Sequence, residues 1–255
     1  MKELNIKNSK LFALLININN PKENSEISNP SDLIKSAQNT DCDIIALIFN
    51  IKSQAEINNT VSLLKDILPE ISKPLMIYGT GDDELDKILL PELIKNLDRE
   101  NCIISSANEK TYKNIVPEII KGGHYLVLKS PIDINLAKEL NILSADMGLN
   151  LDKIIMNTDI GGLGYGYEYG FSILEKVKLE GKNDEYLNLP IISDAALESL
   201  KTKEAKSDEF SKSWGERSSR AQMIELSAAA GVIAAGADII TITFPENIKI
   251  LKGLI

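Results

Sequence analysis

The sequence predicts an α/β fold of the (β/α)8 TIM barrel type, arranged as a single domain over residues 1–255. Eight continuous apolar runs are each followed by a helical pattern, which is typical of parallel strands buried on both faces. The runs come at nearly even spacing, and a chain of this length suits one closed barrel. No glycine-rich turn follows the first run, as it does in a dinucleotide-binding open sheet.

The expected strands are short apolar segments that begin and end at polar or glycine positions. In chain order they are Leu11–Asn17, Ile44–Phe49, Leu75–Gly79, Cys102–Ser106, Tyr125–Leu128, Lys153–Thr158, Pro190–Ser193 and Asp238–Thr243.

The expected helices between them have apolar residues at three- and four-residue steps. They include Ala55–Leu68, Asp83–Leu97, Thr111–Ile120 and Asp133–Met147. Asp32 and Asp133 stand where an N-cap or first-turn acid helps a helix begin, and Gly122-Gly123 and Gly236 stand where a left-handed residue ends one.

One connection is unusually long: about twenty polar residues, 194–215, separate the seventh strand from a helix that ends near Ala235. A short helix, Ala195–Ala205, is expected within it. Long loops after barrel strands lie at the C-terminal face, where barrel sites are made.

Composition excludes several kinds of partner. There are 37 acidic and 28 basic residues, a net charge of −9, so nucleic acid and anionic membranes are not expected as partners. The apolar run Leu11–Ile18 is too short to span a bilayer and has no cleavage site of a signal peptide after it. With only two cysteines, the chain fits a reducing cytoplasm.

The cysteine and histidine side chains, which are common metal ligands and catalytic groups, are expected at the end of the barrel opposite to the one where sites form. Cys42 precedes the second strand, Cys102 opens the fourth and His124 opens the fifth, so all three should lie at the N-terminal floor. We expect buried structural roles for them, no metal site and no catalytic residue in this chain.

Small polar residues dominate the opposite end, where the strands finish. Such a rim can hydrogen-bond a polar heterocycle such as a pterin, or simply face solvent. The residues in question are Asn17, Asn50, Thr80, Asp82, Ser106, Asn108, Lys129, Ser130, Asn157, Thr158, Asp159, Ser193, Asp194 and Thr243.

The segment Asn157–Gly170 carries the most specific signal. Its glycines allow the backbone to approach a large flat ligand or a partner surface closely, and their spacing does not fit a dinucleotide site. Tyr165 and Tyr169 are four residues apart and share a helical face with Ile173, which core packing also explains. Glu168 lies between them and can cap the loop or bond a neighbour.

Here the sequence resembles the small (delta) subunit family of the corrinoid iron-sulfur protein, found in acetyl-CoA decarbonylase/synthase (CO dehydrogenase/acetyl-CoA synthase) complexes. The family's Gly-Tyr-Gly-x-Glu-Tyr motif reads here as residues 164–169, followed by Ser172 and Glu175-Lys176. Residues 189–205 also agree, as do Trp214-Gly215 through Arg220, Glu225 and residues 236–238. The chain departs from the family in a shorter N-terminal region, in Leu200 or Ile224 where relatives have Trp, and in Phe244 where they have His.

The resemblance implies a non-redox subunit that shields a corrinoid (cobalamin) during methyl transfer from a methyl-tetrahydropterin to acetyl-CoA synthase. The corrinoid and the iron-sulfur cluster belong to a large (gamma) subunit, and this chain carries no cluster of its own. The other implied partners are a pterin-dependent methyltransferase and acetyl-CoA synthase. The implied cofactor-facing residues are Asn157, Asp159, Gly162, Gly164, Tyr165, Gly166, Tyr167, Glu168, Tyr169, Ser193 and Asp194.

Two other functions remain open on the sequence. Related barrels hold a pterin ring with Asp and Asn at strand ends, so the chain could be an autonomous pterin-binding methyltransferase anchored by Asn157 and Asp159. It could also keep the barrel as a scaffold only.

Overall fold

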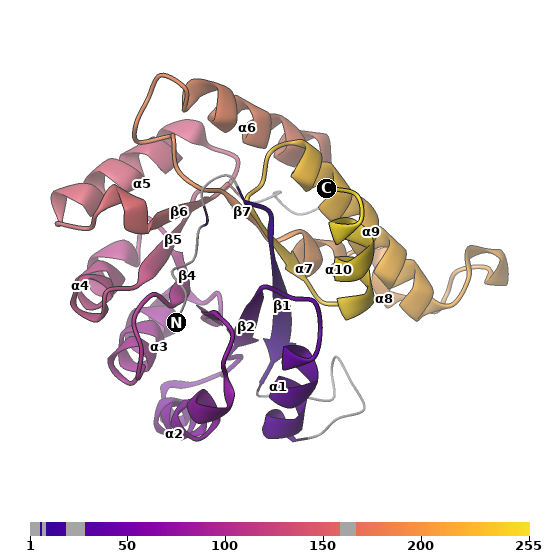
Figure 1. The fold of residues 1–255 in the computed structure, drawn as a ribbon, viewed down its shortest axis with the longest axis horizontal. Coiled ribbons are helices and arrows are strands. Elements are labelled where there is room, and N and C mark those ends of the chain that lie inside the picture. The colour runs from indigo at the N-terminus through magenta and orange to yellow at the C-terminus, as the bar shows by residue number, and fades with distance from the viewer. Residues whose placement is uncertain (1–5, 7–8, 19–28, 159–166) are drawn as a thin grey trace.

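The computed structural model describes residue 6 and residues 9–18, 29–158 and 167–255. Eight parallel strands form the centre and helices surround them (Figure 1). The strands are β1 (Leu11–Asn17), β2 (Ile44–Ile48), β3 (Leu75–Tyr78), β4 (Ile103–Ala107), β5 (Tyr125–Lys129), β6 (Ile154–Asn157), β7 (Ile192–Ser193) and β8 (Ile239–Ile242).

The helices alternate with the strands, as the sequence pattern predicts. They are α1 (Pro30–Gln38), α2 (Ile57–Ile67), α3 (Asp83–Lys95), α4 (Tyr112–Gly122), α5 (Ile134–Asp146), α6 (Tyr167–Glu180), α7 (Ala195–Ser199), α8 (Lys203–Lys206), α9 (Arg217–Ala234) and α10 (Pro245–Lys252). Short 3-10 turns are η2 (Gln54–Glu56), η3 (Leu68–Glu70), η4 (Leu151–Lys153) and η6 (Lys212–Trp214).

The sheet runs in the order β6-β5-β4-β3-β2-β1-β8-β7 and nearly closes on itself. Between its two ends, β6 and β7, a single parallel bridge joins Met156 to Ile191, and the Met156 amide donates to the Pro190 carbonyl at 2.8 Å. This confirms the predicted barrel. It also shows that the seventh strand is shorter than expected, since regular pairing in β7 begins at Ile192.

The core has two layers because strand side chains alternate between the inside of the barrel and the helices. Ala13, Leu15, Met76 and Val127 belong to the inner cluster, which Ile6 joins. Leu14, Ile45 and many other residues pack against the helices in the outer cluster. This alternation determines which polar side chains at the strand ends face inward.

Helix boundaries follow the predicted capping chemistry. The Asp133 carboxylate accepts from the amides of Asn135 and Leu136 at the start of α5, and Asp32 lies in the first turn of α1. Gly123 ends α4 with a φ of 66°, a conformation that favours glycine. Among the described residues, no helix is long and apolar enough to cross a membrane.

The predicted helix Ala195–Ala205 is wrong in one respect, because it is two separate helices. α7 ends at Ser199, and Thr202 is extended (φ −66°, ψ 153°) before α8 begins at Lys203. The break sends the chain outward into the long connection that precedes α9.

Candidate functional site

A polar layer covers the C-terminal end of the apolar barrel interior. Leu15, Val127, Ile155, Ile192 and Ile239 all point inward, so the residues two positions further along each strand point inward too. The residues at these positions are Asn17, Lys129, Asn157, Asp194 and Thr241. Tyr78 belongs to the inner cluster itself and also points inward. We call these six residues the mouth layer.

Asp194 connects three strands of the mouth layer. Tyr78 Oη donates to its Oδ1 at 2.6 Å, and Asn157 Nδ2 donates to its Oδ2 at 2.6 Å. All three side chains are buried, with Asn157 fully enclosed. Because a buried polar group that loses its hydrogen bond is costly, these two bonds hold the trio in one arrangement at the mouth.

The polar residues at strand ends predict Asn157 and Asp194 as site residues but not Tyr78. The tyrosine lies in an apolar run, which indicates only a strand. The available signal was its place two residues after Met76, which makes it the last inward-facing position of β3.

Ser193 and Thr243 lie beside the mouth layer. Ser193 follows the inward-facing Ile192, so its side chain points toward the helices, and its buried Oγ has no hydrogen-bond partner among the residues that the structure describes. The Thr243 amide donates to Glu225 of α9, whose carboxylate also accepts from the Phe244 amide. Burial is the main cause that raises the pKa of Glu225. Glu225 thus links α9 to the start of α10 by hydrogen bonds.

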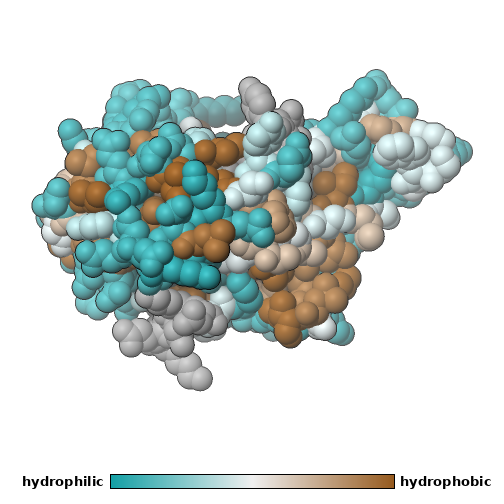
Figure 2. Space-filling view, turned by 90° about the horizontal axis from the view of Figure 1, so that it is seen from above, coloured by the Kyte–Doolittle hydropathy of each residue, from teal (hydrophilic) through white to brown (hydrophobic). Residues whose placement is uncertain are grey.

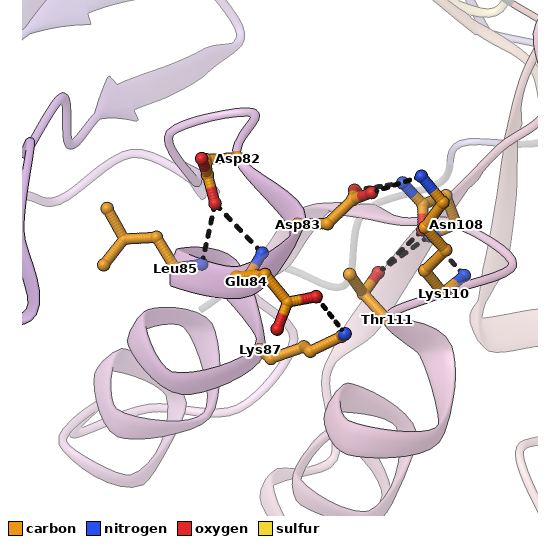
Figure 3. A network of polar contacts seen from close by, with 8 residues as sticks. All are labelled: Asp82, Asp83, Glu84, Leu85, Lys87, Asn108, Lys110 and Thr111. Atoms are coloured by element: carbon orange, nitrogen blue, oxygen red, sulfur yellow. Dashed lines mark hydrogen bonds and ion pairs between the residues drawn. The ribbon is translucent and has the colours of Figure 1, made fainter.

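A rim pocket of about 350 Å³ opens beside the ends of β3, β4 and β5. On its wall, Asp83 accepts from Asn108 Nδ2 at 2.7 Å and pairs with Lys110 at 3.0 Å (Figure 3). The hydrogen bond from Asn108, followed by that from Lys110, lowers the pKa of Asp83. Lys129 of the mouth layer also lines this pocket, so the pocket adjoins the barrel interior.

Several polar residues of the predicted rim serve the backbone. Asp82 caps α3 by accepting from the amides of Glu84 and Leu85 at 3.0 Å (Figure 3). Asp86 accepts from the Thr80 amide at 2.7 Å, and burial is the main cause that raises its pKa. These contacts account for the local polarity without a ligand.

The glycine-tyrosine segment is described only from its last part. Asp159, Gly162, Gly164, Tyr165 and Gly166 lie outside the described residues.

The residues after them form the first turn of α6. Tyr167 Oη donates to the Ala228 carbonyl of α9 at 2.7 Å, and burial raises the pKa of Tyr167 to about 12. Tyr169 is 56% exposed, although Ile173 on the same face is buried. Glu168 is exposed. Tyr167 therefore fixes α6 against α9, whereas Glu168 and Tyr169 face outward.

The two cysteines and the histidine lie at the floor end, as the sequence predicts. Cys42 and Cys102 are buried free thiols just before β2 and β4. His124 precedes β5 and is buried, which lowers its pKa to about 4. Within the described part of the chain, no group of three His, Cys, Asp or Glu side chains could hold a metal ion. The mouth can act by hydrogen bonding and by excluding water.

Comparison with known proteins identifies relatives of one kind. Residues 23–248 match the profile of the CO dehydrogenase/acetyl-CoA synthase delta subunit. The acetyl-CoA decarbonylase/synthase complex subunit delta of Methanocaldococcus jannaschii is 29% identical over 194 residues, 75% of this chain and 47% of that protein. That of Archaeoglobus fulgidus is 28% identical over 202 residues, covering 76% and 44%. The chain thus spans about half the length of the curated relatives it matches.

Solved structures with the same fold include two dihydropteroate synthases. Dihydropteroate synthase from Thermus thermophilus superposes with a TM-score of 0.65 at 13% identity, covering 98% of this chain and 94% of that one. A dihydropteroate synthase from Coxiella burnetii in complex with pteroic acid gives 0.63 at 14% identity, covering 97% and 94%. At these identities the likeness shows a common barrel fold.

Proposed function

Since this chain belongs to the CO dehydrogenase/acetyl-CoA synthase delta subunit family, we propose that it is the non-redox barrel subunit of a corrinoid iron-sulfur methyl carrier. The observation that supports this most directly is the position of its histidine and cysteine residues, the usual ligands of transition metals. The sequence has one histidine and two cysteines, and all three are buried at the floor, opposite the mouth. This arrangement supports a division of labour in which another subunit supplies the metal centre at the mouth.

The proposed role of the mouth is to cover the corrinoid that a large (gamma) subunit carries. The bound corrinoid supplies the cobalt that accepts and releases the methyl group. The amides and hydroxyls of the mouth layer and of the rim suit the amide-bearing edge of a corrinoid, because they can both donate and accept hydrogen bonds. Burying that edge also excludes water and oxidants from reactive cobalt.

The proposed partners are the large subunit, a pterin-dependent methyltransferase and acetyl-CoA synthase. We also propose that residues 1–255 form one barrel unit and that it works in the cytoplasm, where its two free thiols stay reduced.

Size-exclusion chromatography with light scattering tests the docking role. The chain and its large subunit should elute together as one heterodimer. Separate elution at concentrations well above micromolar would end the docking proposal.

Binding of a pterin by the chain alone is a second candidate function. It is supported by the buried pair Asn157 and Asp194, an amide and a carboxyl group that are hydrogen-bonded to each other at adjacent strand ends, and by the fold shared with dihydropteroate synthase in complex with pteroic acid. Asp159, expected as the other anchor, lies outside the described residues.

Titration calorimetry with methyl-tetrahydrofolate and methyl-tetrahydromethanopterin separates the two functions. Micromolar binding that is lost in Asp194→Asn supports an autonomous pterin site. No heat with either pterin, while the large subunit still binds, rejects it.

A further inference from the structure

The long connection after β7 leaves the barrel and forms an arm, residues 201–217, that carries α8 and η6. It projects away from the body beyond the start of α9 (Figure 1). The barrel does not need this excursion, because α7 directly follows β7 and packs against β8, and α9 provides the outer helix. A projecting element of this kind can reach a second molecule.

Arg220 of α9 holds the arm in one conformation. Its guanidinium donates hydrogen bonds to the carbonyl oxygens of Glu204, Ser207 and Gly215, at both ends of the arm. The guanidinium also lies 5.1 Å from the ring centre of Phe210. Arg220 is itself buried. Because this buried cation forms hydrogen bonds with three carbonyls of the loop, it keeps the arm preorganised.

The arm presents an exposed tryptophan. Trp214 is 59% exposed and packs one side on Phe210, with ring centres 5.1 Å apart. Tryptophan is among the residues most enriched at the energetic centres of protein interfaces. An indole that is held on one side by another ring is preorganised for binding.

The charges of the arm nearly cancel, unlike those of the acidic chain as a whole. The arm has five basic and four acidic side chains, whereas the whole chain has a net charge of −9. Two of its ion pairs lie within the arm, Arg217 with Asp208 at 3.1 Å and Lys203 with Glu209 at 3.7 Å. Another acidic protein can approach here without strong like-charge repulsion.

An apolar groove begins on the same helix. It has a volume of about 380 Å³ and is lined by Tyr167, Met223, Ile224, Ser227 and Ala228. Met223 is 58% exposed. Apolar residues gather beside the base of the projecting arm in Figure 2. Because α9 carries both the base of the arm and the groove, one partner can engage both.

We propose that the arm is the docking element through which this chain holds the large corrinoid iron-sulfur subunit, with Trp214 inserted into an apolar pocket of that protein. The inference rests on the proposed subunit function and adds the surface that performs it. The partner is a protein with an apolar pocket that also offers an acceptor to the indole N–H. The α6–α9 groove extends the contact.

Trp214 is the only tryptophan of the chain, so it reports on its own burial. We would replace it with 5-hydroxytryptophan, which can be excited without exciting the tryptophans of the partner, and add the large corrinoid iron-sulfur subunit. The emission should shift to shorter wavelength and become protected from acrylamide. Complex formation without either change overturns the inference.

Calorimetry with variants provides the energetic test. Trp214→Ala should weaken binding of the large subunit by about 30-fold or more, as expected for a central interface residue. Leu179→Ala, at an equally exposed residue of α6 (60%), is the matched control and should change affinity less than 3-fold, roughly within measurement scatter. Circular dichroism of both variants should match the wild type, since both side chains are exposed.

The outcomes separate the two proposals. Wild-type binding with an affinity that Trp214→Ala leaves unchanged overturns the arm inference and leaves the subunit function standing. No binding of the wild-type chain overturns both.

Discussion

Asp194 lies where three strands end, and both of its carboxylate oxygens accept buried hydrogen bonds. In Asp194→Asn, one oxygen becomes an NH2 group that cannot accept, so Tyr78 or Asn157 loses an acceptor. We expect the free energy of unfolding to fall by about 1–3 kcal/mol, the usual cost of an unsatisfied buried polar group. Urea denaturation measures this. Asp152→Asn, at an exposed residue, should be neutral, and an equal loss there would show that charge alone matters.

His124 gives the folded state a defined pH dependence. Its pKa is about 6.5 in an unfolded chain, and burial lowers it to about 4 in the folded protein. Below pH 6.5 the unfolded chain binds a proton that the folded chain does not. The contribution of His124 to the free energy of unfolding should therefore be greatest above pH 6.5. It should decrease by about 3 kcal/mol as the pH falls toward 4. Below pH 4 both states are protonated and the loss stops.

The His124→Gln variant isolates this contribution. Urea denaturation of both proteins between pH 4 and 8 gives a difference curve in which all other titrating groups cancel. That difference should be flat above about pH 7 and change between 6.5 and 4. A flat difference over the whole range would mean that His124 is protonated in the folded protein as easily as in the unfolded chain.

Arg220 stabilises an element rather than the core. In Arg220→Met the stem remains, but the carbonyls of Glu204, Ser207 and Gly215 lose their donor. Each charged hydrogen bond contributes about 1.5–3 kcal/mol, so the open arm should be populated at least about 10-fold more.

A protease that cleaves after lysine measures that opening at Lys206 and Lys212. Arg217→Met is the matched control, because it removes only the exposed pair with Asp208 and should change the cleavage rate little. Equal cleavage rates in Arg220→Met and the wild type would show that the arm is held by other contacts.

Gly231 and Tyr167 couple α9 to α6. A Cβ at Gly231 would come within 2.0 Å of Tyr167 Oη. Gly231→Ala normally gains about 1 kcal/mol in a helix. Here the tyrosine must move and give up its bond to the Ala228 carbonyl. We expect a net loss of about 1–3 kcal/mol in thermal or urea denaturation.

A double-mutant cycle with Tyr167→Leu tests the cause, because the shorter side chain removes the clash. Gly231→Ala should then be neutral or stabilising. A loss that persists in the Tyr167→Leu background would place the strain elsewhere in α9.

The sequence predicted the elements well and their breaks poorly, for a physical reason. Strand positions follow from apolar runs such as Leu11–Asn17, because burial on both faces requires them. The position of α8 after the break is held by Arg220, which lies 16 residues after Glu204 and donates to its carbonyl. Tyr78 likewise became a site residue only when β3 and β7 came together. Contacts between distant segments leave little trace in local pattern.

At the scale of the whole barrel, the seam between β6 and β7 is the weakest closure. β1 and β2 pair over five residues, from Ala13 with Ile44 to Asn17 with Ile48, whereas only the Met156–Ile191 bridge joins β6 to β7. The Asn157–Asp194 hydrogen bond also crosses this seam, at the mouth. The polar trio that forms the candidate site therefore also helps to close the barrel.

Hydrogen exchange can measure this seam with a matched pair of amides. Met156 N donates to the Pro190 carbonyl at 2.8 Å across the seam, and Ile45 N donates to the Pro74 carbonyl at 2.9 Å within the continuous sheet. Both residues are buried, so a difference in exchange reports local opening. We expect Met156 to exchange at least about 10-fold faster than Ile45, and Asp194→Asn to widen that ratio by accelerating Met156 more. If both amides exchange at one rate in both proteins, the barrel opens as a single unit, and the Asn157–Asp194 bond has no part in closing it.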